Sequence, residues 1–213
     1  MKRYLLVMLL LPAVVASAQD DSQPVTHYVF DRFYPGKVYM KAGEPSAVSL
    51  NYNALTNEMV FDNNGKYLAI SNPEMVDSVE INGRVFIPAD NKFYEMLTHT
   101  PNPLCREYTC TIKSAEVTNG YGAVTNASAI TSVKGVGQNV LYQLVLPSEY
   151  KVTAKRTWWI KTGNGFRKVG NEQQLKKLFP EKKDQISEWV KKNNTDFSKQ
   201  EDMVLLVQQI DKQ

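Results

Sequence analysis

Six cationic and three large aromatic side chains are concentrated in residues 151–170, a stretch that has no acidic residue. Side chains alternate between the two faces of a strand, so a regular strand over residues 151–161 would place Trp159 on the same face as its lysines. Aromatic rings offer stacking area, and cationic groups complement negative charge. The segment therefore predicts a binding patch for an anionic glycan, a lipid headgroup or an acidic envelope protein. Its members are Lys151, Lys155, Trp159, Lys161, Arg167 and Lys168.

A second interpretation of the same segment is structural. Lysines on an exposed edge strand prevent edge-to-edge pairing with other chains, and Trp159 would then pack beneath the C-terminal helices. The even-numbered residues, among them Val152, Trp158 and Ile160, form a plausible core face. Arg156 lies on that face and would extend its charged end to solvent. Both interpretations stay open at the level of sequence.

The two cysteines, Cys105 and Cys110, lie five residues apart. In an oxidising compartment this spacing predicts a local disulfide that rigidifies a turn, and a free pair is the alternative. A loop this short would contribute roughly 2 kcal/mol in the chain-entropy model. The spacing matches neither a redox Cys-x-x-Cys motif nor a four-ligand zinc site, so no metal is expected here.

Motifs of the common catalytic sites are absent from the sequence. It contains no Gly-x-Ser-x-Gly, no phosphate-binding Gly-x-x-x-x-Gly-Lys and no His-Glu-x-x-His, and its Gly-x-Gly pairs lack the third glycine of a dinucleotide loop. His27 and His99 are far apart in the chain. We therefore expect no cofactor, no catalytic residue and no enzymatic activity. A glycan-processing site built from two dispersed carboxylates is the alternative, because such residues meet only in the fold.

Residues 1–18 have the pattern of a secretory signal peptide. A basic start at Lys2 and Arg3 precedes an apolar run, and small residues end at Ala18. Removal of this leader lowers the formal net charge from +3 to +1, which favours no nucleic-acid partner. No cysteine stands at the cleavage site and no later segment is suited to span a membrane. The prediction is a soluble exported protein of the periplasm or cell surface that is not a lipoprotein.

After a lead-in at residues 19–37, residues 38–170 have the pattern of an antiparallel β-domain. Asn-Gly at residues 64–65 and 82–83 separates short apolar runs, and this dipeptide favours tight hairpin turns. Further strands are expected at residues 108–112, 140–146, 151–161 and 166–169, with a long loop at 119–138. We expect an α+β fold in which the strands form a sandwich or a half-barrel.

Residues 171–213 are predicted to form a three-helix module that packs on the β-domain. This part has eight lysines, eight acidic residues and no glycine, with apolar residues at helical spacing. The first helix contains Leu175 and Leu178 and ends before Pro180; the second contains Ile186 and Val190. Ser198 and Glu201 have the spacing of a capping box for the third helix. That helix should bury Met203, Leu206, Val207 and Ile210.

Four short segments resemble a group of exported Bacteroidetes proteins of unknown function. They are residues 50–53 (Leu-Asn-Tyr-Asn), 57–61 (Asn-Glu-Met-Val-Phe), 82–86 (Asn-Gly-Arg-Val-Phe) and 179–183 (Phe-Pro-Glu-Lys-Lys). The resemblance implies a Gram-negative envelope and supplies no catalytic residues. In that setting Asp77-Ser78-Val79 is similar to a bacterial O-glycosylation acceptor, with Ser78 as the modified residue.

These features together predict a non-catalytic envelope or surface protein that binds a partner. A carrier of lipid or another apolar ligand is the main alternative, in which the helices would cover a cavity on a curved sheet. The carrier and the glycan-processing enzyme both require a cleft or cavity, so the packing between helices and sheet bears on each.

Overall fold

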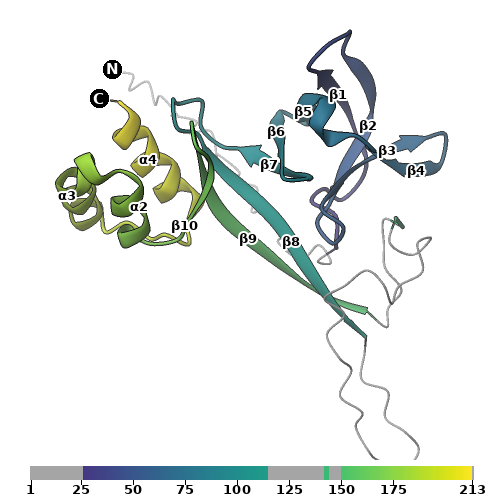
Figure 1. Cartoon of the computed structure of the whole chain (residues 1–213). Coiled ribbons are helices and arrows are strands. Elements are labelled where there is room, and N and C mark those ends of the chain that lie inside the picture. The colour runs from purple at the N-terminus through teal and green to yellow at the C-terminus, as the bar shows by residue number, and fades with distance from the viewer. Residues whose placement is uncertain (1–25, 115–141, 144–149, 213) are drawn as a thin grey trace, which may run out of the picture.

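The described strands form one antiparallel ten-stranded sheet (Figure 1). A computed structural model describes residues 26–114, 142–143 and 150–212. In the sheet the strands lie in the order β10-β9-β8-β7-β6-β5-β1-β2-β3-β4. Their bounds are β1 Tyr34–Met40, β2 Ser46–Asn53, β3 Glu58–Asn63, β4 Lys66–Ala69, β5 Val76–Ile81, β6 Arg84–Ala89, β7 Lys92–Met96, β8 Leu104–Ser114, β9 Tyr150–Thr162 and β10 Gly165–Val169. A 3-10 turn, η1 (Pro73–Met75), leads into β5. The expected antiparallel pairing of the strands is confirmed.

Two meanders meet at a single seam in this sheet. Strands β1 to β4 pair consecutively, and so do β5 to β10. Among the ten described strands, only β1 and β5 pair without being consecutive in the chain. Gly36 lies in this seam, between Val48 of β2 and Ile81 of β5. The backbone of Gly36 is therefore flanked by a strand on either side, β2 on one and β5 on the other.

Both predicted Asn-Gly turns are confirmed. Asn64 and Gly65 have φ of 55° and 83° between β3 and β4, and Asn82 and Gly83 have φ of 48° and 72° between β5 and β6. These positive values are those of the two-residue hairpin turns whose twist matches the flanking strands. The turns fix the register of two hairpins, and with it which side chains face the core.

The sheet is curved, and its first core lies inside the curve. Strand β3 contacts β7, and the backbone N–H of Cys110 in β8 donates to the carbonyl oxygen of Ala54 at 3.0 Å. Strands far apart in the sheet order are thus in contact, as in a half-barrel. The core contains thirteen buried residues: Phe30, Val38, Leu50, Tyr52, Ala54, Met59, Val76, Val79, Ile81, Phe86, Phe93, Tyr108 and Cys110.

The lead-in before β1 is held on this core by Asn51. This fully buried amide donates from Nδ2 to the carbonyl oxygens of Phe30 and Arg32, at 2.9 and 3.0 Å, and its Oδ1 accepts from the N–H of Phe30 at 3.1 Å. A buried amide must form such bonds, since an unpaired one would destabilise the fold. The ordered fold thus begins before residue 38.

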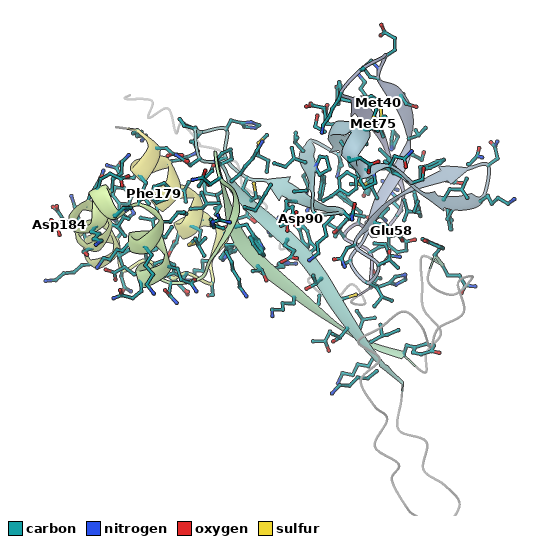
Figure 2. All side chains as sticks on the ribbon, viewed as in Figure 1. Met40, Glu58, Met75, Asp90, Phe179 and Asp184 are labelled. Atoms are coloured by element: carbon teal, nitrogen blue, oxygen red, sulfur yellow. The ribbon has the colours of Figure 1, made fainter. Side chains whose placement is uncertain are left out.

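The C-terminal helices pack on the β8–β10 end of the sheet and form a second core. The helical elements are α2 Glu172–Leu178, η3 Pro180–Lys182, α3 Lys183–Asn193 and α4 Gln200–Asp211. Leu104, Trp158, Ile160 and Val169 of the strands contact Leu175, Phe179, Ile186, Met203, Leu206, Val207 and Ile210. Figure 2 shows side chains, Phe179 among them, filling the helical module. The α+β class is confirmed, and the four residues that the third helix was predicted to bury are buried. Leu178 of the first helix and Val190 of the second are partly buried.

The predicted capping box of the third helix is wrong. The hydroxyl and backbone N–H of Ser198 both donate to Oδ1 of Asp196, at 2.7 and 2.9 Å, which forms a local turn instead. Helix α4 therefore begins at Gln200. Its N-cap residue is Lys199, whose side chain forms no capping hydrogen bond. The hydroxyl of Ser198 thus bonds to the carboxylate of Asp196 and not to the backbone of the first turn of the helix.

The predicted disulfide is also wrong. Cys105 and Cys110 are free, buried, and both part of strand β8. An odd spacing places them on opposite faces of the strand, about 16 Å apart at ~3.3 Å per residue. A disulfide requires Cα atoms closer than about 7 Å.

Burial makes both thiols unreactive in the folded protein. It raises the pKa of each, Cys105 and Cys110, to about 12, so little thiolate exists at neutral pH. We expect a thiol reagent at pH 8 to label neither residue in the native protein and both after denaturation without reductant. Labelling stoichiometry by mass spectrometry measures this. Zero labels in the denatured, unreduced chain would instead show a disulfide.

None of the helices among the described residues is long and apolar enough to cross a membrane. The predicted leader (1–18), the loop predicted at 119–138 and nearly all of the strand predicted at 140–146 lie outside the described residues.

Candidate functional site: a basic groove at the edge of the sheet

The predicted binding patch is divided between the two faces of the sheet. Directly opposed residues of antiparallel strands point to the same face. Lys168 opposes Trp159, so it shares the face of Trp159, Lys155 and Lys161, whereas Arg167 opposes Ile160 and points to the other face. The five cationic residues of the predicted patch are exposed, and Trp159 is half-buried.

Trp159 is packed into an aromatic cluster on the face away from the helices. Its ring meets Tyr94 edge-on at 5.6 Å, and Tyr94 stacks on Phe166 at 4.3 Å. Its Nε1 donates to Oε2 of Glu107 at 2.9 Å, and Lys92 pairs with the other oxygen at 2.8 Å. Trp159 is therefore engaged within the protein. The residue that packs beneath the helices is Trp158, whose Nε1 donates to the carbonyl oxygen of Phe197 at 2.8 Å.

A groove of about 590 Å³ lies beside β9, where β10 ends and α4 begins. Its cationic lining residues are Arg106, Lys155, Arg156, Lys168 and Lys199, and Glu201 is the one acidic residue that lines it. We call this the basic groove. Lys155 and Lys168 belong to the patch predicted from sequence; Lys151, Trp159, Lys161 and Arg167 do not line the groove. The other three cations come from strands β8 and β9 and from the residue before α4.

Arg106 connects the basic groove to a buried ion network. Glu95, only 4% exposed, accepts from Nε and Nη2 of Arg106 at 2.9 and 2.6 Å and from Nε and Nη2 of Arg84 at 2.6 and 2.9 Å. The hydroxyl of Tyr108 donates to the same carboxylate at 2.6 Å. Nη1 of Arg106 donates to Oε1 of Gln200 at 2.5 Å. One carboxylate thus faces two guanidinium groups, which leaves an excess positive charge behind the groove.

This network keeps Glu95 ionised. Burial by itself would raise the pKa of Glu95, but the hydrogen bonds and charges of Arg84 and Arg106, with the hydroxyl of Tyr108, lower that pKa below its ordinary value. A carboxylate whose pKa is lowered and whose oxygens accept several hydrogen bonds is ionised at neutral pH, so it has no proton to donate as a general acid. Its role here is to position Arg106 through two hydrogen bonds that converge on its Oε2.

The two buried acids of the described residues, Glu95 and Glu107, do not form a pair of facing carboxylates. Glu95 opposes Arg106, whereas Glu107 is the next residue along β8, so the two acids point to opposite faces of the sheet. No group of three or more His, Cys, Asp or Glu residues within the described ranges could hold a metal ion.

Ser78, the candidate glycosylation residue, lies within β5 opposite Tyr39 of β1. It is half-buried, and its hydroxyl donates to Oδ2 of Asp77 at 3.2 Å.

Comparisons of the chain with protein-family models, with curated proteins and with solved structures found no match. The resemblance to exported Bacteroidetes proteins stays a prediction.

Proposed function

We propose that this is a non-catalytic exported protein that binds a negatively charged partner in the basic groove. The observation that carries the proposal is the convergence of five cationic side chains on one concave site with a single carboxylate. Four of them, Lys155, Arg156, Lys168 and Lys199, are exposed, so they can contact a ligand from solvent. Positive charge in a concave site attracts and orients anionic ligands.

Arg106 adds a fixed charge to the mobile lysines. Its side chain is 11% exposed and is held by Glu95 on one side and Gln200 on the other. A guanidinium group in a fixed orientation needs little ordering when a carboxylate, sulfate or phosphate arrives. The groove therefore combines exposed cationic side chains with one guanidinium group, that of Arg106, in a fixed orientation.

The alternatives receive less support. A lipid carrier requires a cavity between helices and sheet, but eleven buried residues fill that interface, from Leu104 of β8 to Ile210 of α4. A glycan-processing enzyme requires two facing carboxylates, and the buried Glu95 and Glu107 point to opposite faces. Binding requires only the groove.

The test uses three anionic probes: poly-L-glutamate, heparin and vesicles containing phosphatidylglycerol. The protein is expected to bind at least one of them, more weakly as ionic strength rises. Lys155→Glu combined with Lys199→Glu should weaken that binding at least 10-fold. The matched control is Lys66→Glu with Lys177→Glu, at exposed lysines of β4 and α2. It changes the net charge by the same amount and should retain the binding. Equal losses in both pairs, or no binding at all, would contradict the proposal.

A further inference from the structure

Strand β9 extends well beyond the strand beside it. Its residues pair with β8 from Tyr150 to Ile160, but β10 pairs only with residues 158–162. Residues 150–157 therefore have a neighbouring strand on one side and none, among the described residues, on the other. An eight-residue edge of this kind is about 26 Å long, enough for a complete additional strand.

The basic groove occupies the position that β10 leaves vacant. Val169 is buried in the second core, and after Gly170 the chain turns into α2, where Oδ1 of Asn171 accepts from the N–H of Gln174 at 3.0 Å. The groove is lined by the last residues of β10, by residues 155–158 of β9 and by residues 197–201. A strand entering it would continue the line of β10 along β9.

The register predicts which backbone groups face this vacant position. The N–H of Lys161 donates to the carbonyl oxygen of Pro103, on the β8 side, at 3.0 Å. In an antiparallel strand alternate residues direct both their N–H and C=O to the same neighbour. Odd-numbered residues of β9 therefore bond toward β8, while Arg156, Ala154 and Val152 present their backbone groups to the open edge.

Charge selects the kind of strand that fits. Lys155 and Lys168 lie on one face of the sheet and Arg106 and Arg156 on the other, so a guest strand would meet cations on both of its faces. Lysines on an edge discourage pairing with apolar or basic strands, but they favour an acidic one. An anionic polysaccharide could match the charge and would leave the backbone groups of the edge unused.

We propose that the open edge of β9 binds an extended acidic peptide segment of a protein partner as an additional strand of the sheet. The inference rests on the proposed function and specifies its ligand class. Backbone hydrogen bonds to β9 would supply affinity, as in other cases of strand addition, and the cations would select Asp and Glu side chains.

The test uses a nine-residue synthetic peptide of three Glu-Glu-Thr repeats, which carries Glu on both faces of a strand. Its partner is the same peptide N-methylated at every residue, because methylation of alternate residues would leave one edge of the strand free to pair. N-methylation removes backbone donors and leaves the charge unchanged. We expect the unmodified peptide to bind and the methylated peptide to bind at least 10-fold more weakly. Hydrogen exchange at the amides of Arg156 and Ala154 should slow when the unmodified peptide is added.

A substitution tests the edge from the protein side. Ala154→Pro removes one outward-facing N–H and keeps every cation, and proline is tolerated in strands only at such edge positions. It should weaken peptide binding at least 10-fold and leave heparin binding unchanged, while Ala154→Ser should retain both. The methylated peptide provides the same test on the unaltered protein if the proline variant does not fold.

The outcomes separate this inference from the proposed function. Equal binding of the two peptides would show that charge alone acts, which overturns strand addition but not the basic groove. Binding of heparin or vesicles without binding of the peptide would likewise overturn only the strand proposal. Failure of all probes would overturn both.

Discussion

Glu95→Gln is expected to lower the free energy of unfolding by about 3–5 kcal/mol, the usual cost of removing one partner from a buried ion network. Glu95 accepts all of the hydrogen bonds that Arg84 and Arg106 donate to a carboxylate. Glutamine would leave these two partly buried guanidinium groups with no negative charge between them. Urea denaturation at pH 7 measures the loss. The matched control is Glu80→Gln, because Glu80 is exposed and accepts only one long side-chain bond, from Tyr39 at 3.3 Å.

The same residue determines how stability responds to acid. The folded protein lowers the pKa of Glu95, so the ionised carboxylate stabilises the fold above its unfolded pKa of ~4.3. This contribution is lost as the pH falls from there through the lower pKa of the folded state. Wild-type stability should decrease over this range more steeply than that of Glu95→Gln. Parallel pH profiles would show that Glu95 is not the group that couples folding to protons.

Gly36→Ala is expected to destabilise the protein by about 3 kcal/mol, at the upper end of the cost of overpacking. A Cβ at this residue would lie 2.4 Å from the backbone oxygen of Glu80 and 3.0 Å from Cδ1 of Leu50. A leucine side chain can move, but the oxygen of Glu80 belongs to β5, so β1 and β5 would have to separate at their seam. Thermal unfolding followed by circular dichroism measures the effect.

Gly163→Ala is the control for this substitution. Nothing lies within 4 Å of a Cβ at Gly163, and its φ is not in the left-handed region, so alanine there should be neutral or slightly stabilising. If Gly36→Ala were as stable as this control, β1 and β5 would not approach each other as closely as the structure indicates.

The turns and helices of this fold could be predicted because their signals lie within a few consecutive residues. Asn-Gly at residues 64–65 and 82–83 marks its turns because few other dipeptides adopt two positive φ values easily. The turn at Asp90 and Asn91, with φ of 50° and 58°, has a weaker signal and was not predicted. Apolar spacing was sufficient for the helices, where Met203, Leu206 and Val207 are buried as expected.

The wrong predictions arose where a short-range pattern competed with another partner. The disulfide assumed a turn between Cys105 and Cys110, although the intervening Tyr108 and Thr109 favour a strand. The capping box ignored Asp196, which takes the hydroxyl of Ser198.

The basic groove could be found only in part from the sequence. Lys155 and Lys168 belong to a visibly basic segment, but Arg106 and Lys199 lie 49 and 44 residues from Lys155 in the chain. They reach the groove through β8 and the start of α4. No local pattern in the sequence indicates that these residues converge, because their proximity results from the pairing of strands and the docking of helices.

Strand β8 contributes to both cores from the same face. Leu104 packs under the helices, Tyr108 and Cys110 pack inside the curved sheet, and Arg106 lies between them in the ion network. Neither core can lose its packing without disturbing a strand that the other one needs. Heat should therefore unfold the described part of the chain in one cooperative transition, with equal calorimetric and van't Hoff enthalpies. The C-terminal helices, although they begin at a sharp change in composition, would then not be a cassette that can be removed or exchanged on its own.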